Sequence, residues 1–330
     1  MNVAIGIDIG GTNTVIGFIT KNGNCIHEEA IKTKSFKSAE QLVTTLCDKI
    51  KLAAAHLKEK IELVGIGIGA PNGNYYNGTI EFAPNLPWNG VINLSKLFSK
   101  HFSIPIAVTN DANAAAMGEM LFGGAKGIDN FVVITLGTGV GSGFVINGDI
   151  VYGHDGFAGE VGHVVIDPEG RDCGCGRKGC LETYASVTGI VRTAHIYLGK
   201  STRKSILRDY SSNQLSGRII TEAARNGDEL ALEIFDYTAQ KLGFFLANMV
   251  AISSPEQIIF FGGLAKSGDL LLKPTKVYME KNLLNIFQNK IILKASELNH
   301  NASVIGAGAL IWKEIELTSH TASYVPISLN

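Results

Sequence analysis

The stretch VAIGIDIGGTNTVIGFI, residues 3–19, contains two apolar runs separated by a glycine-rich segment. The runs from Val3 to Ile7 and from Val15 to Ile19 are rich in β-branched residues, which favour strands. Between them, DIGGTNT at 8–14 supplies the glycines that a tight turn needs. Two such runs joined by a glycine turn predict a β-hairpin at the start of the chain.

A second stretch repeats this pattern in the middle of the chain. FVVITLGTGVGSGFVI at 131–146 is again an apolar run, a glycine-rich segment (GTGVGSG, 137–143) and a second apolar run. Each block is followed by a turn, KNGN at 21–24 and NGD at 147–149. The repetition predicts two domains of similar topology, with chance similarity of two glycine-rich hairpins as the alternative.

The remaining sequence alternates between strand-like and helix-like patterns. Apolar residues at helical spacing predict helices at 39–58, 183–198, 229–252 and 302–316, and short apolar runs predict strands at 61–69, 104–108 and 257–261. Strands alternating with helices indicate an α/β fold. A length of 330 residues favours about two domains.

Composition excludes several classes of partner. The net charge is −1, so no basic surface for nucleic acid or for an anionic membrane is expected. No apolar run approaches the roughly 18 residues of a membrane span, and no cleavable leader is recognisable after Met1. With Cys25 and Cys47 resembling free thiols, the sequence predicts a cytoplasmic enzyme or binding protein.

The stretch AGEVGHVVIDPEGRDCGCGRKGCLE, residues 158–182, has the composition of a metal site. Cys173, Cys175 and Cys180 lie within eight residues, and His163 lies ten residues upstream of the first. Three thiolates and one imidazole are the four ligands of a closed, tetrahedral structural zinc site. The alternative is a reduced cysteine-rich loop without metal. Disulfides are not expected, because pairing two of the three cysteines would leave one unpaired.

The two glycine turns are candidates for phosphate binding. Turns built from glycine and threonine present backbone N–H groups in a concave cluster that binds phosphate, and Thr12 and Thr138 can add hydroxyl donors. Asp8, just before the first turn, could hold a hydrated Mg²⁺ or could simply cap the turn. Gly199-Lys200-Ser201 resembles the end of a Walker A motif, but a helix rather than a strand precedes it, so this site is rejected.

Asp111 lies at the carboxyl end of the strand predicted at 104–108, where open α/β sheets place their ligands. A carboxylate there can take the proton of a hydroxyl nucleophile, as the catalytic base does in kinases. It precedes the helix predicted at 112–121, so capping is an equally good interpretation. Polar groups suited to sugar hydroxyls are Asn85, Glu160, His163 and Glu182, although solvated loop charge is the commoner fate of a glutamate.

The sequence as a whole resembles the sugar kinases of the ROK family (repressor, open reading frame, kinase). The motifs that carry the resemblance run in order over most of the chain: DIGGTNT at 8–14, GAPNG at 69–73, PNLPW at 84–88, NDANAAAMGE at 110–119, GTGVGSG at 137–143, AGEVGH at 158–163, CGCGRKGCLE at 173–182 and GG at 262–263. One departure is Asn72, where many members have glycine.

The resemblance implies an actin-like ATPase fold in which two ribonuclease-H-like domains close a cleft over ATP and a hexose. The expected small α/β domain comprises 1–110 plus about 311–330, and the expected large domain comprises 111–310 with the zinc loop. Homodimers or dimers of dimers are expected, and the apolar helix at 229–252 is compatible either with a dimer interface or with a core.

The resemblance also implies roles for individual residues. Asp111 would be the base, and Glu160, His163 and Glu182 would bind sugar hydroxyls with help from Asn85 and Asn110. His163 would also bind zinc beside Cys173, Cys175 and Cys180. The expected nucleotide-binding residues are Asp8, Gly10, Gly11, Thr12, Asn13, Gly137, Thr138, Gly139, Gly262 and Gly263.

The implied activity is phosphorylation of a hexose at its 6-hydroxyl by ATP with Mg²⁺, with glucose as the expected sugar and glycolysis as the expected setting. The alternatives are an N-acetylhexosamine kinase, for N-acetylmannosamine or N-acetylglucosamine, and a non-catalytic sugar sensor. ROK repressors carry a helix-turn-helix domain ahead of the kinase-like part, whereas the first strand here is predicted to begin at Val3, which favours the kinase.

Overall fold

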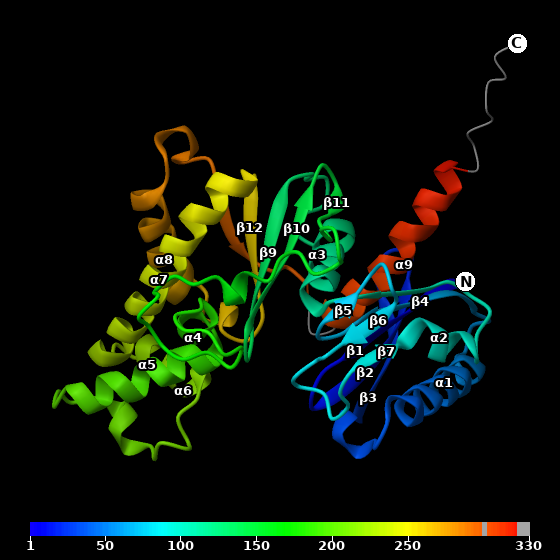
Figure 1. The fold of residues 1–330 in the computed structure, drawn as a ribbon, viewed down its shortest axis with the longest axis horizontal. Helices are drawn as coiled ribbons and strands as arrows, with labels where there is room; N and C mark the ends of the chain where they lie inside the picture. Colours follow the sequence, from blue (N-terminus) through cyan, green and yellow to red (C-terminus); the bar gives the residue numbers. More distant parts are fainter. Residues whose placement is uncertain (299–301, 322–330) are drawn as a thin grey trace, which may run out of the picture. The chain divides into compact units, whose positions relative to one another are not determined.

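The computed structural model of the chain describes residues 1–298 and 302–321, with side chains up to residue 317 (Figure 1). Contacts divide it into two units. Unit 1 comprises 1–127, 152–158 and the chain from 297 onward, and unit 2 comprises 128–151 and 159–296. The predicted small domain extends to residue 330, of which 322–330 lie outside the described residues.

Unit 1 is built on a five-stranded sheet in the order β3-β2-β1-β4-β8. The predicted N-terminal hairpin is present, since β1 and β2 pair antiparallel, and β3 continues it antiparallel. β4 pairs parallel with β1, and β8 pairs parallel with β4. The bounds are Asn2–Ile9 (β1), Asn13–Thr20 (β2), Cys25–Lys32 (β3), Glu62–Gly69 (β4) and Ile106–Thr109 (β8).

Residues alternate along β1 so that large apolar side chains lie on one face of this sheet and glycine lies on the other. Val3, Ile5, Ile7 and Ile9 are fully buried in one core cluster with apolar residues of α1 (Ala39–His56). On the other face, a Cβ at Gly6 would collide with the carbonyl oxygen of Val304 in α9 (Ala302–Thr321). Side chains of a strand point alternately to opposite faces, so glycine here lets the α9 backbone lie directly on the sheet.

The other elements of unit 1 are short or cover the sheet. α2 (Leu94–Ser99) contacts β8, and α3 (Asp111–Phe122) packs along α9. A separate three-stranded sheet contains β5 (Gly73–Asn74), β6 (Thr79–Glu81) and β7 (Val91–Asn93). A single turn of 3-10 helix, η1, spans Thr33–Ser35.

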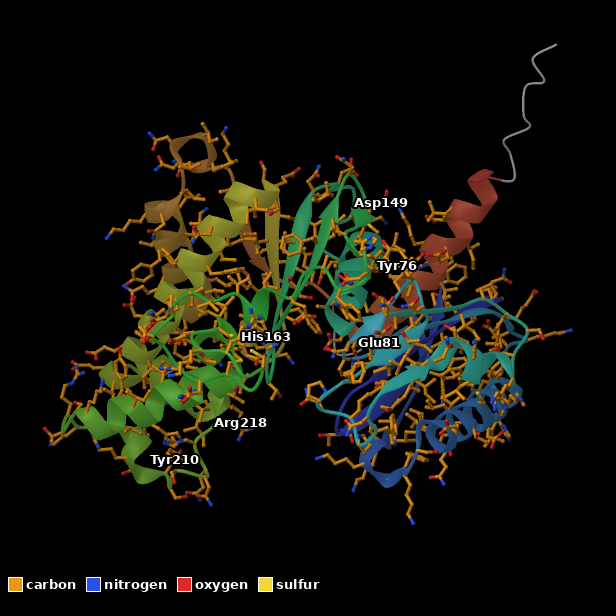
Figure 2. All side chains as sticks on the ribbon, viewed as in Figure 1. Tyr76, Glu81, Asp149, His163, Tyr210 and Arg218 are labelled. Carbon is orange, nitrogen blue, oxygen red and sulfur yellow. The ribbon has the colours of Figure 1, made fainter. Side chains whose placement is uncertain are left out.

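The segment 152–158 belongs to unit 1 although its neighbours on both sides belong to unit 2. The rings of Tyr75 and Tyr152 are stacked with centroids 4.1 Å apart, and the Tyr76 hydroxyl donates to the carbonyl of Gly153 at 2.9 Å (Tyr76 is labelled in Figure 2). The Asn74 side chain donates to the carbonyl of Asp155 at 2.8 Å. These contacts fasten the segment to the loop that contains β5.

Unit 2 has a five-stranded sheet in the order β11-β10-β9-β12-β13. Its strands are Phe131–Leu136 (β9), Val140–Ile146 (β10), Asp149–Ile150 (β11), Gln257–Phe261 (β12) and Ile292–Ala295 (β13). The helices of this unit supply one large core cluster with β9 and β12. They are α4 (Glu182–Ala185), α5 (Val187–Lys200), α6 (Gly217–Arg225), α7 (Glu229–Ser253) and α8 (Asp269–Asn282), with 3-10 turns at Val161–His163 (η2), Ile206–Asp209 (η3), Ala265–Ser267 (η4) and Asn285–Phe287 (η5).

The two sheets share one topology, which confirms the predicted repeat. In each, a glycine-turn hairpin is extended by a third antiparallel strand on one side and by two parallel strands on the other. The mixed sheets with helices also confirm the α/β class. The apolar residues of α7 are mostly buried in the core of unit 2, so this helix gives no support to the predicted dimer.

Six helix starts in the described part of the chain follow the capping rule, whereas α4 and α8 have no side-chain cap. A side-chain oxygen at the residue before the helix accepts a backbone N–H of the first turn, which is the interaction that favours Ser, Asn and Asp there. The capping residues are Ser38 for α1, Asn93 for α2, Asn110 for α3, Ser186 for α5, Ser216 for α6 and Asp228 for α7.

The structure differs from the sequence predictions in two places. The single helix predicted at 183–198 is wrong, because Ser186 is extended and separates α4 from α5; its hydroxyl donates to the Glu182 carbonyl and caps α5 through Gly189 N–H. Contacts also assign 111–127, 152–158 and the chain from 297 onward to unit 1, whereas the predicted boundaries place 111–310 in the large domain. Among the described residues, no helix has the length and apolarity to cross a membrane.

Candidate functional site

The start of α3 decides between the two interpretations of Asp111, a helix cap or a catalytic base. Asn110 is the capping residue, because its Oδ1 accepts the N–H of Asn113 at 2.6 Å. Asp111 is the first helical residue, is exposed, and accepts the N–H of its neighbour Ala112 at 2.9 Å. The protein packed around it raises the pKa of the Asp111 carboxyl, against backbone hydrogen bonds from Ala112 and Asp111 that lower it. Capping therefore falls to Asn110, and Asp111 has oxygen lone pairs available for other chemistry.

Asp8 lies in unit 1 at the carboxyl end of β1, at the edge of the sheet where β4 and β8 also end. Gly69 pairs with Asp8 on one side and with Thr109 on the other, and a Cβ at Gly69 would come within 3.1 Å of the Ala114 Cβ, so the start of α3 lies close to this strand. Burial raises the pKa of Asp8 to about 6; a hydrogen bond from Ser303 opposes the rise and the charge of Asp111 adds to it. Two carboxyl groups that both resist ionisation form an acidic pair at this edge.

The first glycine turn is closed by its own backbone and by the loop at 84–88. Gly10 N–H donates to the carbonyl of Asn13 at 3.0 Å, and Thr12 and Asn13 are exposed. A Cβ at Gly11 would collide with the carbonyl oxygen of Asn85. The structure thus brings the predicted nucleotide turn and the predicted sugar residue Asn85 together in unit 1.

The second glycine turn lies at the matching edge of the unit 2 sheet. β9 and β12 are parallel neighbours, so the turn after Leu136 and the pair Gly262-Gly263 follow strands that end side by side. Leu264 N–H donates to the carbonyl of Leu136 at 3.0 Å, and a Cβ at Gly262 would come within 2.7 Å of that same oxygen. Gly262 also has φ +102°, a conformation that glycine adopts readily. The two predicted glycine sites of this unit are therefore adjacent.

Glu182 joins this turn to the cysteine loop. Its Oε2 accepts the N–H of Val140 at 3.1 Å, and its Oε1 lies 4.0 Å from the Sγ of Cys173. Glu182 is half-buried at the first position of α4. The position of this carboxylate is thus fixed from the glycine turn on one side and from the cysteine loop on the other.

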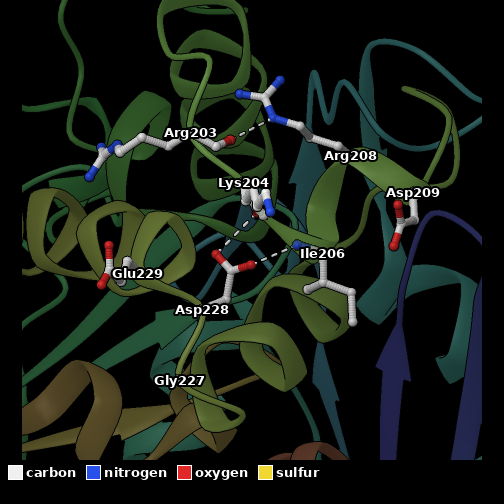
Figure 3. Close-up of a pocket in the computed structure, with 9 residues that line it drawn as sticks. Arg203, Lys204, Ile206, Arg208, Asp209, Gly227, Asp228 and Glu229 are labelled. Carbon is white, nitrogen blue, oxygen red and sulfur yellow. Dashed lines mark hydrogen bonds between the residues drawn. The ribbon is translucent and has the colours of Figure 1, made fainter.

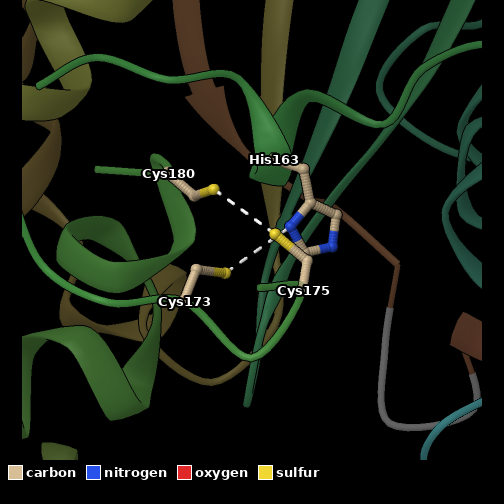
Figure 4. A group of neighbouring side chains, drawn as sticks. All are labelled: His163, Cys173, Cys175 and Cys180. Carbon is tan, nitrogen blue, oxygen red and sulfur yellow. Dashed lines mark hydrogen bonds between the residues drawn. The ribbon is translucent and has the colours of Figure 1, made fainter. Parts of the chain in front are cut away.

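The predicted metal ligands converge on one point (Figure 4). One ligand atom from each of His163, Cys173, Cys175 and Cys180 lies within 4.8 Å of the others. His163 Nδ1 lies 3.7 Å from Cys173 Sγ, and Cys175 Sγ lies 3.7 Å from Cys180 Sγ. Four ligands at about 2.3 Å from a tetrahedral zinc are about 3.8 Å apart, so the spacing fits zinc. The same distances are far too long for a disulfide.

The thiols are also chemically suited to a metal. The backbone N–H of Arg177 is the largest influence that lowers the pKa of Cys175, to about 6, whereas burial raises the pKa of Cys180 to about 12. Metal-binding cysteines bind as thiolates, and an exposed Cys175 with a low pKa is ionised at neutral pH. His163 faces the sulfurs through Nδ1, so Nε2, on the opposite edge of the ring, is available to a second partner.

Glu160 and His163 occupy the two ends of one short turn. Glu160 precedes the 3-10 turn η2, and His163 N–H donates to the Glu160 carbonyl at 3.1 Å. Glu160 is exposed and His163 is half-buried. Any metal bound by His163 would also fix the backbone that carries Glu160, because a backbone hydrogen bond joins the two residues within one turn.

The site residues fall on both units. Unit 1 holds Asp8, the first glycine turn, Asn85, Asn110 and Asp111, and unit 2 holds the second glycine turn, Glu160, Glu182, Gly262-Gly263 and the metal ligands. Two contacts that support these residues could not be predicted from the sequence. These are the hydrogen bond of Ser303 to Asp8 and the contacts of Arg171 with α4. A lone serine or arginine has no characteristic spacing by which it could be recognised.

A pocket of about 750 Å³ in unit 2 contains none of these residues (Figure 3). Three cationic side chains line it, Arg203, Lys204 and Arg208, and so do three acidic ones, Asp209, Asp228 and Glu229. Asp228 is occupied in capping α7 and in accepting the N–H of Ile206 at 2.7 Å. With balanced charge and an acidic group already bonded, the pocket offers no preference for phosphate. The nearby Gly199-Lys200 ends a helix, α5, which agrees with the rejection of a Walker A motif.

Comparison with known proteins gives consistent results over nearly the whole chain. The ROK family profile matches residues 4–314. A glucokinase of Halalkalibacterium halodurans is 38% identical over 93% of this chain and 94% of its own length. A xylose repressor of Caldicellulosiruptor bescii is 30% identical over 93% of this chain and 77% of its own length.

Among solved structures, a ROK family glucokinase from Streptomyces griseus in complex with glucose and AMPPNP superimposes with a TM-score of 0.79. It is 33% identical, and the match covers 93% of this chain and 98% of that one. With the family profile and these identities over almost the full length, the chain belongs to the ROK family.

Proposed function

We propose that this protein is a glucokinase, which transfers the γ-phosphoryl group of ATP to the 6-hydroxyl of glucose. The observation that carries the proposal is the similarity, over 93% of the chain, to a ROK glucokinase whose structure contains glucose and AMPPNP. The glucokinase of Halalkalibacterium halodurans supports the same reaction at 38% identity.

Asp111 is the proposed general base. In the reaction the proton of the glucose 6-hydroxyl passes to an Asp111 oxygen, the bond from that hydroxyl oxygen to the γ-phosphorus forms, and the bond from phosphorus to ADP breaks. The exposed carboxylate at the start of α3, freed from capping by Asn110, suits this role. Positioning and electrostatics account for most of the catalysis in phosphoryl transfer.

The sugar is proposed to bind through its hydroxyls, which both donate and accept hydrogen bonds and therefore suit carboxylate, amide and imidazole partners. Glu160, Glu182 and His163 Nε2 from unit 2 and Asn85 and Asn110 from unit 1 are the proposed partners of its hydroxyls. Glu182 already accepts one N–H through Oε2, so its remaining lone pairs would receive sugar hydroxyls in a fixed direction.

The two glycine turns are the proposed nucleotide contacts. Gly10, Gly11, Thr12 and Asn13 in unit 1 would contact the phosphates, as would Gly137, Thr138 and Gly139 in unit 2, with Gly262 and Gly263 beside them. A Cβ at Gly137 would meet no atom within 4 Å, so the backbone there is open to a ligand.

Two metals fit the residues present. The Cys₃His cluster has the donor set and spacing of structural zinc, which when bound would order the loop carrying Glu160 and Glu182. The carboxyl groups of Asp8 and Asp111 supply oxygen ligands for a second metal. Burial raises the pKa of both groups, and a bound cation would stabilise their ionised forms. These properties fit Mg²⁺ at Asp8, held through water. Bound Mg²⁺ neutralises part of the charge of the ATP phosphates.

A coupled assay of ADP release tests the proposal. Purified protein with ATP and Mg²⁺ is given glucose, mannose, fructose, N-acetylglucosamine or N-acetylmannosamine in turn. The highest kcat/KM for glucose is expected. Preference for an acetylated sugar would make the protein an N-acetylhexosamine kinase. Sugar binding without ADP release would indicate a non-catalytic sugar sensor.

A further inference from the structure

Arg171 lies two residues before the first cysteine of the metal cluster and makes an unusual set of contacts within unit 2. Its guanidinium carbon lies over the ring of Tyr184, 4.5 Å from the centroid, and 5.7 Å from the centroid of the Tyr237 ring. Nη1 donates to the carbonyl of Thr183 at 2.7 Å. The planar guanidinium thus joins the cysteine loop to α4 by stacking and by hydrogen bonding.

The same guanidinium reaches a second helix. Nη1 also donates to the carbonyl of Gly189 at 3.2 Å, and Nη2 donates to the hydroxyl of Thr193 at 2.9 Å. Both acceptors belong to α5, and Thr193 is fully buried. Arg171 therefore links the loop, α4 and α5 at one point, and none of these bonds involves a metal ligand.

The α4 helix needs such support because it is only one turn long. Its last carbonyls have no partner within the helix, and an isolated turn is unstable in water. The hydroxyl of Ser186 donates to the Glu182 carbonyl at 2.7 Å, and Arg171 donates to the carbonyl of the next residue, Thr183. These two side chains satisfy consecutive carbonyls of the turn.

Glu182 is the first residue of this turn, so whatever holds α4 also holds the Glu182 carboxylate against Val140. We infer that Arg171 is a positioning residue for Glu182, which it fixes by bonding α4 directly rather than through the metal. The inference rests on the proposed function in so far as Glu182 binds the sugar. Lysine cannot replace arginine in this role, since it lacks the planar fork that bonds two helices and stacks on a ring.

Arg192 provides a matched control. It lies on α5, and its Nη1 donates to the carbonyl of Asp172 at 2.9 Å. It thus contacts the same cysteine loop, but it is exposed and bonds the loop backbone rather than α4. Arg171→Lys and Arg192→Lys each remove guanidinium contacts to the loop region, and only the first removes the partner of the Thr183 carbonyl.

The experiment compares three quantities in the wild type, Arg171→Lys and Arg192→Lys: zinc per chain, hydrogen exchange of the amides of 182–186, and the glucose dissociation constant by calorimetry without ATP. In Arg171→Lys we expect one zinc per chain, at least tenfold faster exchange at 182–186 and at least tenfold weaker glucose binding. In Arg192→Lys all three should stay within about twofold of wild type. Thr193→Val, which removes one acceptor of Arg171, should weaken glucose binding two- to fivefold.

Three results would overturn the inference. One is unchanged exchange at 182–186 in Arg171→Lys, and another is an equal effect of Arg192→Lys. The third is loss of zinc from Arg171→Lys, because the metal would then account for weaker binding. If Arg171→Lys does not fold, Thr193→Val decides, and wild-type glucose binding in that variant counts against the role. If the wild type itself binds no glucose, the proposed function fails while hydrogen exchange still tests the support of α4.

Discussion

Gly139 lies directly against the Glu182 carboxylate, so that a Cβ on Gly139 would collide with the Oε2 of Glu182. The same oxygen accepts the N–H of the next residue, Val140. The proposed nucleotide turn and a proposed sugar-binding carboxylate are therefore packed together within unit 2. A side chain at position 139 must therefore move the Glu182 carboxylate, although the two residues are 43 positions apart in the sequence.

Gly139→Ala is therefore expected to weaken glucose binding as well as ATP binding. The added methyl group displaces the Glu182 side chain and breaks its bond to Val140 N–H, so the glucose dissociation constant should rise about tenfold or more, roughly 1.4 kcal/mol. Gly137→Ala is the control, because a Cβ at Gly137 meets no atom within 4 Å. Calorimetry with glucose alone should find the control within twofold of wild type, and equal effects of the two variants would contradict the coupling.

Asp111→Asn should abolish turnover without unfolding the protein. General bases contribute typically 10²–10⁴-fold, so kcat should fall by at least about 100-fold while glucose binding and Tm change little. Asn110 continues to cap α3, which is why the fold should tolerate the change. Activity within about tenfold of wild type would mean that another group accepts the proton.

Asp8 makes stability depend on pH in a predictable direction. Burial first, with the charge of Asp111 adding to it, raises its folded-state pKa to about 6, above an unfolded value near 3.9. The folded protein therefore holds this proton more tightly, and the stabilisation it gives is lost as pH rises from about 4 to about 6. The loss is up to about 3 kcal/mol before allowance for the partial solvent access of Asp8, which makes it smaller.

Asp8→Asn cannot ionise, so without Mg²⁺ the Tm of the variant relative to wild type should be higher at pH 7.5 than at pH 5.0. Thermal unfolding at the two pH values measures this difference. Asp48→Asn, an exposed position on α1, is the control and should show no such trend. A constant Tm difference for Asp8→Asn would show that Asp8 ionises normally in the folded protein.

Removal of zinc should lower glucose affinity and stability together. Cys175→Ala removes one ligand of the cluster, and we expect less than one zinc per chain, a lower Tm and weaker glucose binding. Cys25→Ala, outside the cluster, should keep the metal and the affinity. Metal analysis of carefully purified wild-type protein should give one zinc per chain, and a clearly lower content would count against the site.

The features that the sequence predicted well depend on residues close together in the chain. Each glycine hairpin is complete within about 17 residues, so the pattern at 3–19 was enough to predict β1 and β2, and 131–146 to predict β9 and β10. The cysteine cluster was visible for the same reason. The Cys₃His spacing follows from a loop whose glycines at 174, 176 and 179 allow tight folding.

The features that escaped prediction depend on tertiary contacts or on very short elements. The strands β5, β6 and β7 have two or three residues each, too few to show a period of two. The break at Ser186 interrupts a good helical pattern and is stabilised by the Glu182 carbonyl and by Val187 N–H bonding the Gly137 carbonyl at 2.8 Å. No local pattern indicates that Arg171 contacts two helices.

The assignment of 152–158 to unit 1 has a consequence for proteolysis. The chain passes between the units at 127–128, 151–152, 158–159 and 296–297. A protease that nicks any one of these crossings leaves three covalent connections intact, so no single cut can release either half as a free fragment. The two units are therefore joined by four covalent crossings of the chain, and not by a single linker.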